Sequence, residues 1–230
     1  MKKKEIFIAC DTTSINKIKE IIKNTQTKDL KVGYKIGLEF FNSKKGRDFL
    51  SKLKNKTIWY DAKFLDIPNT VASSIIALKD LKNINYISVH ISGGINMLKA
   101  AKRAAKKINN NCKVIGVSVL TSFSPKSFKD TGHTKSIKNV VVQQARLAMK
   151  AGLDGVVCSA QEIKLIRKIC KRKIIITPGI RFPDDKIQDQ QRVVTPKKAF
   201  DNKADAIVMG RSIVKNNIKK NIQKLINSLK

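Results

Sequence analysis

Short apolar runs alternate with longer amphipathic stretches along the whole chain. Eight runs rich in β-branched residues predict strands, and each is followed by a stretch with helical periodicity. The predicted strands cover residues 6–10, 32–36, 57–60, 86–90, 113–119, 155–158, 174–177 and 206–209. Eight consecutive strand–helix units predict the α/β class and, within it, a single (β/α)8 TIM barrel of eight parallel strands that forms one catalytic domain over residues 1–230.

The starts of the helices and two long connections refine this picture. Helices are predicted to begin near Ser14, Ser43, Pro68, Ile95, Ser136, Ala160, Pro196 and Ser212. Several of these positions carry Ser, a common N-cap, or Pro, which is favoured in a first helical turn. The connections over residues 121–135 and 179–195 are long and polar. Loops of this kind after the fifth and seventh strands predict lids over a site.

The composition adds an unusual charge. Lys and Arg number 48 against 17 Asp and Glu, a formal net charge of +31 that would attract any polyanion at low salt. Forty of the 48 are Lys, scattered over the polar faces of predicted helices, whereas proteins that read bases rely on Arg. We therefore interpret the surplus as solvated surface and expect no specific nucleic-acid partner. A basic nucleic-acid-binding protein is the competing hypothesis.

The N-terminus and the cysteines bear on the cellular compartment. The apolar run after the basic N-terminus ends at Asp11, too short for a signal segment or a membrane span, so we expect a soluble, cytoplasmic protein with no membrane partner. The cysteines at 10, 112, 158 and 170 are widely spaced without a CxxC pair, which predicts buried free thiols. With two histidines and no cysteine cluster, a zinc site has little support.

Charged residues gather where the second and third predicted strands end. Lys35 ends the second strand, Asp61 and Lys63 follow the third, and Asp66 lies on the loop beyond. Residues two apart on a strand share a face, so Asp61 and Lys63 can both point into the barrel mouth. Two lysines and two carboxylates predict a near-neutral tetrad with two positive members for an anionic substrate. The alternative is a salt-bridge network that closes the barrel.

A second group of residues suits an anion. Gly210, Arg211 and Ser212 follow the eighth strand and open the last predicted helix, so backbone N–H groups, the helix dipole and a guanidinium can face one phosphate. Arg181 and Gln190 lie on the seventh connection and could fold over it. Phosphate sites in (β/α)8 barrels favour these two loops. The alternative is an ordinary polar loop followed by a surface arginine.

Together these motifs resemble the orotidine 5′-phosphate decarboxylase family, in its bacterial-type branch. The resemblance runs from about Ile6 to Ile213 and rests on Asp11 and on residues 34–37, 61–70, 120–122, 177–181, 189–190 and 208–212. It implies a lyase of de novo pyrimidine biosynthesis that converts orotidine 5′-phosphate to uridine 5′-phosphate and CO2 without a cofactor or a metal. It also implies that Lys63 donates a proton to C6 of the pyrimidine, and that Lys35, Asp61 and Asp66 complete the charged tetrad.

The resemblance further assigns substrate contacts and a partner. It implies a homodimer in which Asp66 and Thr70 reach into the partner's site. The substrate-binding residues that it implies are Asp11 and Lys35 at the ribose hydroxyls, Thr121 near the base or ribose, and Arg181, Gln190, Gly210 and Arg211 at the phosphate. From the residues alone, the Thr121 hydroxyl can either bind a base edge or cap a helix.

The nearest rival function is a related enzyme with the same DxKxxD motif, such as a keto-gulonate-phosphate decarboxylase or a hexulose-phosphate synthase. Such an enzyme needs Mg²⁺ for an enediolate. Lys35 and the segment 67–70 argue against it. Loss of activity in a chelator would revive it.

Overall fold

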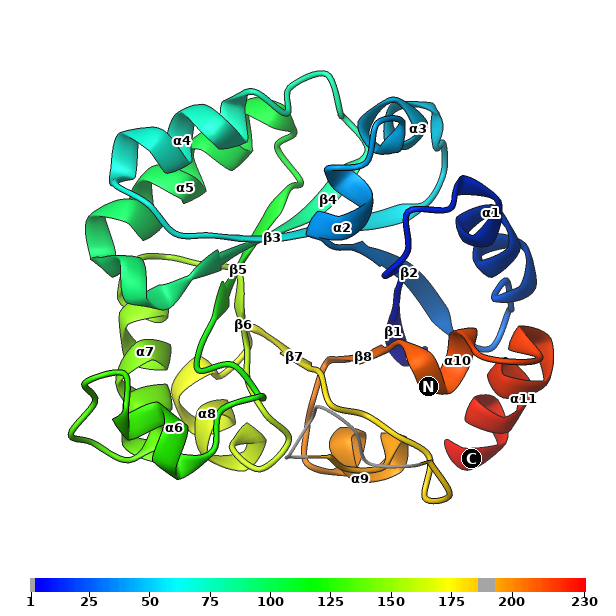
Figure 1. The fold of residues 1–230 in the computed structure, drawn as a ribbon. Helices are drawn as coiled ribbons and strands as arrows, with labels where there is room; N and C mark the ends of the chain where they lie inside the picture. The colour runs from blue at the N-terminus through cyan, green and yellow to red at the C-terminus, as the bar shows by residue number, and fades with distance from the viewer. Residues whose placement is uncertain (1–2, 186–192) are drawn as a thin grey trace.

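Eight parallel strands close into a barrel in chain order, from β1 to β8 (Figure 1). The computed structural model describes residues 3–185 and 193–230. The strands are β1 (Glu5–Ala9), β2 (Lys31–Ile36), β3 (Thr57–Phe64), β4 (Ile84–His90), β5 (Lys113–Val117), β6 (Gly155–Val157), β7 (Ile174–Thr177) and β8 (Ala206–Met209). β1 pairs with both β2 and β8, which closes the barrel. The predicted (β/α)8 fold is confirmed.

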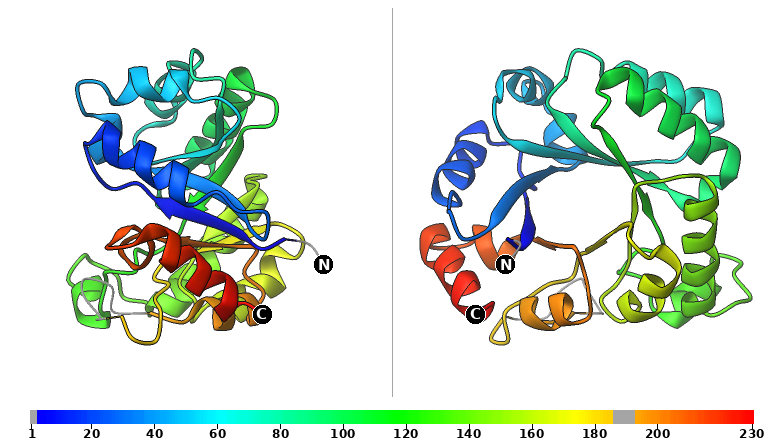
Figure 2. Two further views of the ribbon diagram at one scale, coloured as in Figure 1. Left: turned by 90° about the vertical axis from the view of Figure 1, so that its right-hand side faces the viewer. Right: turned by 180° about the vertical axis from the view of Figure 1, so that it is seen from behind.

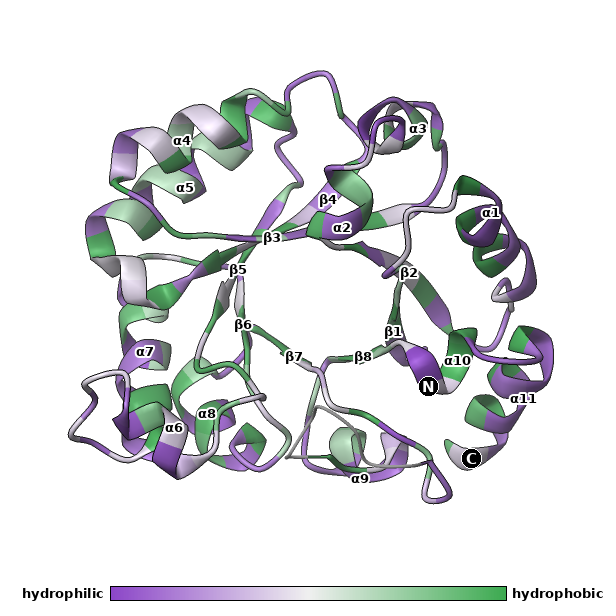
Figure 3. Cartoon of the chain, in the orientation of Figure 1, coloured by the Kyte–Doolittle hydropathy of each residue, from purple (hydrophilic) through white to green (hydrophobic). Residues whose placement is uncertain are grey.

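Helices form an outer ring around the barrel, seen from the side and from behind in Figure 2. They are α1 (Ile15–Asn24), α2 (Leu38–Phe41), α3 (Gly46–Lys52), α4 (Pro68–Ile76), α5 (Gly94–Ile108), α6 (Pro125–Lys129), α7 (Ile137–Lys150), α8 (Ile163–Cys170), α9 (Pro196–Asp201), α10 (Arg211–Val214) and α11 (Ile218–Ser228), with a 3₁₀ turn, η1 (Ile91–Gly93), before α5. Figure 3 shows hydrophobic and hydrophilic residues mixed along each long helix. In α5, for example, Met97, Ala101, Ala104 and Ile108 recur at helical spacing and are buried.

Apolar side chains fill the barrel itself as well as the layer between strands and helices. A separate buried cluster inside the barrel contains Phe7, Trp59 and Tyr86. The Phe7 ring meets the rings of Trp59 and Tyr86 edge to face, each with 5.1 Å between centroids. This packed interior leaves the carboxyl ends of the strands as the place where a ligand can enter.

Several predicted helix starts are confirmed by their caps. The side chains of Ser14, Ser136 and Thr195 accept hydrogen bonds from backbone N–H groups of α1, α7 and α9. Three short elements differ from the prediction. Residues 38–41 and 125–129 form the short helices α2 and α6, which were not predicted. The last predicted helix is divided into two helices, α10 and α11, and Asn216 between them has φ 53°. Helices of four or five residues are too short to produce a periodic pattern.

Two further expectations concern the cysteines and the membrane. All four cysteines are buried and free, as predicted. Over residues 3–185 and 193–230, no helix combines the length and the apolar character that crossing a membrane requires.

Candidate active site

A pocket of about 290 Å³ opens at the carboxyl ends of the barrel strands. Of the residues predicted to form the site, those that line it are Asp11, Lys35, Asp61, Lys63, Thr121, Arg181, Gly210 and Arg211. Trp59 and four valines also contribute to its wall. The predicted phosphate ligand Gln190 lies outside the residues that the structure describes. The barrel thus brings together residues up to 200 positions apart in the sequence.

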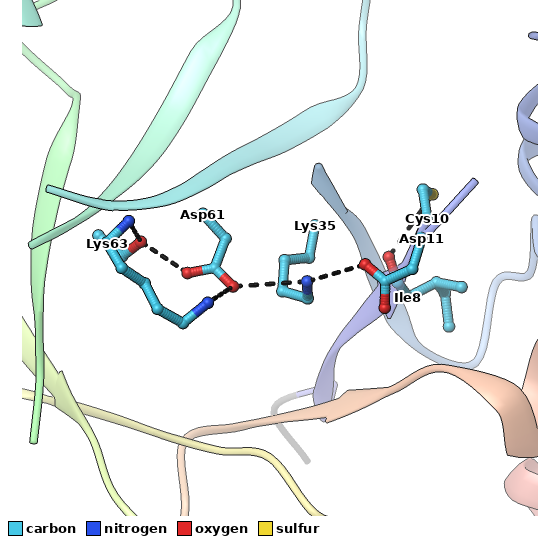
Figure 4. Close-up of polar contacts among 7 residues, drawn as sticks. Ile8, Cys10, Asp11, Lys35, Asp61 and Lys63 are labelled. Carbon is cyan, nitrogen blue, oxygen red and sulfur yellow. Dashed lines mark hydrogen bonds and ion pairs between the residues drawn. The ribbon is translucent and has the colours of Figure 1, made fainter. Parts of the chain in front are cut away.

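Four charged side chains form a row along the pocket (Figure 4). Lys35 Nζ lies 3.2 Å from Asp11 Oδ1 and 3.4 Å from Asp61 Oδ2. Lys63 Nζ donates a hydrogen bond of 2.7 Å to the same Asp61 oxygen. Positive and negative groups therefore alternate, from Asp11 through Lys35 and Asp61 to Lys63.

The row keeps its buried members charged. Burial alone would raise the pKa of Asp61, but Lys35 and Lys63, with hydrogen bonds from Lys63 and Ser88, outweigh it and hold that pKa below its ordinary value of 3.8. Burial would likewise lower the pKa of Lys35, and the carboxylates of Asp61 and Asp11 raise it instead. An ionised carboxylate and a protonated amine thus coexist in the pocket at neutral pH.

The lowered pKa of Asp61 predicts how stability depends on pH. The ionised carboxylate stabilises the folded state fully above pH 3.8, and this contribution is lost as the pH falls through the lowered pKa. We therefore expect the difference in unfolding free energy between the native chain and Asp61→Asn to change as the pH falls below about 3.8, because only the native chain titrates at this position. Chemical denaturation at neutral and acid pH measures this difference.

A suitable control removes a carboxylate from an exposed ion pair. Asp48 pairs with Lys52 at 2.7 Å on the surface of α3. Asp48→Asn is expected to alter the unfolding free energy by less than about 1 kcal/mol throughout. A constant difference between the native chain and Asp61→Asn over the acid range would contradict the role given to the Asp61 charge.

The third strand reaches the pocket through an irregularity. Between Tyr60 and Phe64 the pairing of β3 with β4 shifts, so that three residues of β3 lie opposite Ser88 alone. Lys63, in this bulge, has φ 51°, in the left-handed region. Asp61 and Lys63 do meet in the pocket as predicted, but regular strand alternation is not what brings them there. Ser88 was not singled out from the sequence.

The loops after β7 and β8 bring two arginines to the pocket. Arg181 and Ser212 are both buried, and the Arg181 guanidinium lies 3.5 Å from Ser212 Oγ. Asp185 joins the two loops, because its Oδ2 accepts hydrogen bonds from Ser212 Oγ at 2.5 Å and from the backbone N–H of Phe182 at 2.9 Å. Asp185 is not among the site residues predicted from the sequence.

The prediction for the eighth loop needs one correction. Gly210 and Arg211 open the one-turn helix α10, not the long C-terminal helix α11. A helix dipole grows with the number of aligned peptide groups, so a single turn contributes little. The positive potential here comes instead from the guanidinium groups of Arg181 and Arg211.

Asp66 and Thr70 lie outside the pocket. Both are exposed, as is the whole segment 65–70. Asp66 Oδ1 accepts a hydrogen bond of 2.6 Å from the backbone N–H of Ile67, and neither residue contributes to the pocket wall. Within one chain, the structure therefore assembles three members of the predicted tetrad together with Asp11, and leaves Asp66 facing outward.

Two further features of the described residues bear on the chemistry of the pocket region. His90, at the end of β4, has a lowered pKa because of burial and, to a smaller extent, the nearby charge of Lys63, so the imidazole is neutral at pH 7. No group of three or more His, Cys, Asp or Glu side chains suited to a metal ion occurs in residues 3–185 and 193–230.

Comparison with known proteins agrees with this geometry. A family model described as the orotidine 5′-phosphate decarboxylase / HUMPS family matches residues 4–224. The chain belongs to this family. Its relatives include an orotidine 5′-phosphate decarboxylase from a Wolbachia of Brugia malayi, 42% identical over 96% of each chain. Another, from Carboxydothermus hydrogenoformans, is 38% identical over 91% of this chain and 88% of that protein.

Solved structures give the same result. The crystal structure of orotidine 5′-phosphate decarboxylase from Lactobacillus acidophilus superposes with a TM-score of 0.83, at 29% identity over 99% of both chains. An uncharacterized conserved protein from Geobacillus kaustophilus gives a TM-score of 0.81 at 25% identity, over 98% of this chain and 100% of that one. The predicted family and enzyme class, an orotidine 5′-phosphate decarboxylase, are confirmed.

Proposed function

We propose that the chain converts orotidine 5′-phosphate to uridine 5′-phosphate and CO2, as a step of de novo pyrimidine biosynthesis, without a cofactor. The observation that carries this proposal is the row from Asp11 to Lys63 on β1 to β3. Arg181 and Arg211, on the loops after β7 and β8, lie across the barrel from β3. A pocket with an ammonium at one side and guanidinium groups at the other suits a nucleotide whose reacting carbon and phosphate are far apart.

Lys63 is the residue to which we assign proton transfer. Loss of CO2 breaks the bond between C6 and the carboxyl carbon and leaves the electron pair on C6. The ammonium of Lys63 stabilises this carbanion and then donates its proton to C6. Asp61, held ionised, lies beside Lys63 and would face the substrate carboxylate, which disfavours the bound ground state. Lys63 recovers a proton from solvent after product leaves.

The remaining pocket residues bind the nonreacting parts of the substrate. Asp11 and Lys35 hold the ribose hydroxyls, and Thr121 contacts the base or ribose. Arg181, Gln190, Gly210 and Arg211 bind the phosphate, and charge-assisted hydrogen bonds from the two arginines provide most of that attraction. All of these except Gln190 line the pocket, which supports the assignment.

The active form is a homodimer in which Asp66 and Thr70 complete the partner's site. Two observations support this. Asp66 is exposed and turned away from its own pocket. The residues on either side of it are large, exposed apolar side chains, Leu65 at 56% and Ile67 at 67% exposure. Apolar residues exposed to this degree are typical of a surface that another chain covers.

Mixing two inactive variants tests the shared site. A dimer formed from one Lys63→Ala subunit and one Asp66→Asn subunit has one doubly altered site and one site with both native residues. We therefore expect a mixture of the two inactive variants, exchanged and reassociated, to regain up to about one quarter of native activity in a two-fold symmetric dimer. Steady-state decarboxylation measures it. If Asp66 acted within its own chain, the mixture would stay inactive.

The direct test of the proposed function is the loss of orotidine 5′-phosphate absorbance with purified protein, with and without EDTA, at moderate salt. Decay to uridine 5′-phosphate under both conditions supports the proposal. Decay that EDTA abolishes favours the metal-dependent hexulose-phosphate synthase type of chemistry. A folded protein that causes no decay under either condition rejects the proposal.

A further inference from the structure

The buried hydroxyl of Ser88 contacts both the carboxylate and the backbone of the proposed catalytic segment. Ser88 lies in β4 and is 0% exposed. Its Oγ donates a hydrogen bond of 2.6 Å to Asp61 Oδ1 and accepts one of 3.0 Å from the backbone N–H of Lys63. A serine hydroxyl has one proton to donate, and here that proton goes to the carboxylate.

The contact with Lys63 compensates for the irregular pairing of β3. In the bulge, the backbone of residues 61–63 departs from the regular register with β4. The N–H of Lys63 donates to the Ser88 side chain. A non-glycine residue with φ 51° persists only where its surroundings hold it, and this hydrogen bond is one such restraint. Ser88 thus helps to fix the direction in which the Lys63 side chain leaves the strand.

The contact with Asp61 fixes the orientation of the carboxylate. Oδ1 is taken by Ser88, which leaves Oδ2 to face both Lys35, at 3.4 Å, and Lys63, at 2.7 Å. Rotation of the carboxylate about its Cβ–Cγ bond would exchange these roles. A short hydrogen bond from a buried hydroxyl opposes such rotation, because a charged acceptor binds its donor more strongly than a neutral one does.

We propose that Ser88 is a positioning residue for the decarboxylation, holding Asp61 and Lys63 in one arrangement through a single hydroxyl. The role rests on the proposed function, since it acts on the two groups to which the chemistry is assigned. Ser88 itself does not belong to the pocket wall. Its effect is therefore expected on the rate of the chemical step and not on substrate affinity.

Replacement of Ser88 tests this role. Ser88→Ala removes both hydrogen bonds, and we expect kcat to fall by about 10- to 100-fold while KM changes by less than about threefold. Ser88→Thr retains the hydroxyl and is expected to recover most of the lost rate. Should Ser88→Ala not fold, Ser88→Cys provides a side chain of similar shape with a weak donor and acceptor, and kcat is again expected to fall.

A pH profile separates positioning from a general loss of stability. Ser88 helps to keep the Asp61 carboxylate ionised, so its removal raises the pKa of Asp61 and moves the acid limb of the kcat profile to higher pH. Ser118→Ala is the matched control, because Ser118 is likewise a buried serine, here directly after β5, and its Oγ donates to the carbonyl of Val157 at 2.8 Å. The control is expected to retain native kcat and an unshifted profile.

The outcomes distinguish this role from the proposed function. A folded native protein without decarboxylase activity rejects the proposed function, and with it the role of Ser88. If the native protein is active and folded Ser88→Ala keeps kcat within about twofold, with an unshifted acid limb, Ser88 is structural only and the proposed function stands. A fall in kcat that the Ser118→Ala control matches would also overturn the positioning role.

Discussion

Replacing Lys63 by alanine abolishes decarboxylation and leaves binding of uridine 5′-phosphate nearly unchanged. The ammonium is expected both to stabilise the carbanion at C6 and to supply the proton, so kcat should fall by about 10⁴-fold or more. The product carries no carboxylate and no carbanion, so its affinity depends on the ribose and phosphate contacts. Single-turnover kinetics measure the rate of decarboxylation, and titration calorimetry measures the affinity for uridine 5′-phosphate.

A lysine far from the pocket gives the matched control. Lys52 pairs with Asp48 at 2.7 Å on the surface of α3, and Lys52→Ala removes the same functional group without touching the row of charges. This control should retain native kcat. Turnover by Lys63→Ala at a rate comparable with that of the native protein would refute the assigned mechanism.

Replacing Arg211 by alanine is expected to raise KM by about 100-fold, because a guanidinium–phosphate pair is a charge-assisted contact that an alanine cannot replace. In the proposed binding mode the reacting carbon is at the other side of the pocket, so kcat should change much less than KM. Initial rates over a wide range of orotidine 5′-phosphate concentrations separate the two constants.

The nucleoside orotidine, which lacks the phosphate, provides the control for Arg211. If Arg211 acts on the phosphate, its removal should hardly affect the already slow reaction of orotidine, and the effects of removing the arginine and the phosphate should not add. An unchanged KM for orotidine 5′-phosphate would exclude Arg211 from phosphate binding. An equal loss with both substrates would point to a structural role instead.

The sequence was sufficient for the barrel and for most of the pocket because both depend on simple regularities. β-branched runs identify β7 and β8 to the residue, with the bounds 174–177 and 206–209. Parallel strands in a closed barrel bring their carboxyl ends together, so Lys35, Asp61 and Arg211 could be grouped without coordinates. The roles of these residues in catalysis and binding stay predictions.

The bulge in β3 was beyond sequence reasoning. Regular alternation places Asp61 and Lys63 on one face, and the structure reaches the same result through a register shift and a left-handed Lys63. Neither feature has a sequence marker here, since no glycine occupies the positive-φ position. Ser88 was missed for the same reason: a serine in an apolar strand acquires its importance only from the bulge opposite it.

Other expectations concern how the chain interacts with a second chain, a ligand or solvent. The interpretation of the +31 charge as solvated surface stays a prediction, and so do the lids and the dimer. A pattern along one chain indicates which residues are exposed or buried in that chain. It does not report what a second molecule covers, and the role proposed for Asp66 depends on such a molecule.

The single tryptophan of the chain gives the pocket an optical reporter. Trp59 is the one Trp in the sequence, and it is fixed against Phe7 while contributing to the pocket wall. Light that excites indole but not tyrosine therefore produces fluorescence from Trp59 alone. Fluorescence emission can follow ligand entry in variants that no longer turn over, without a label or a coupled reaction.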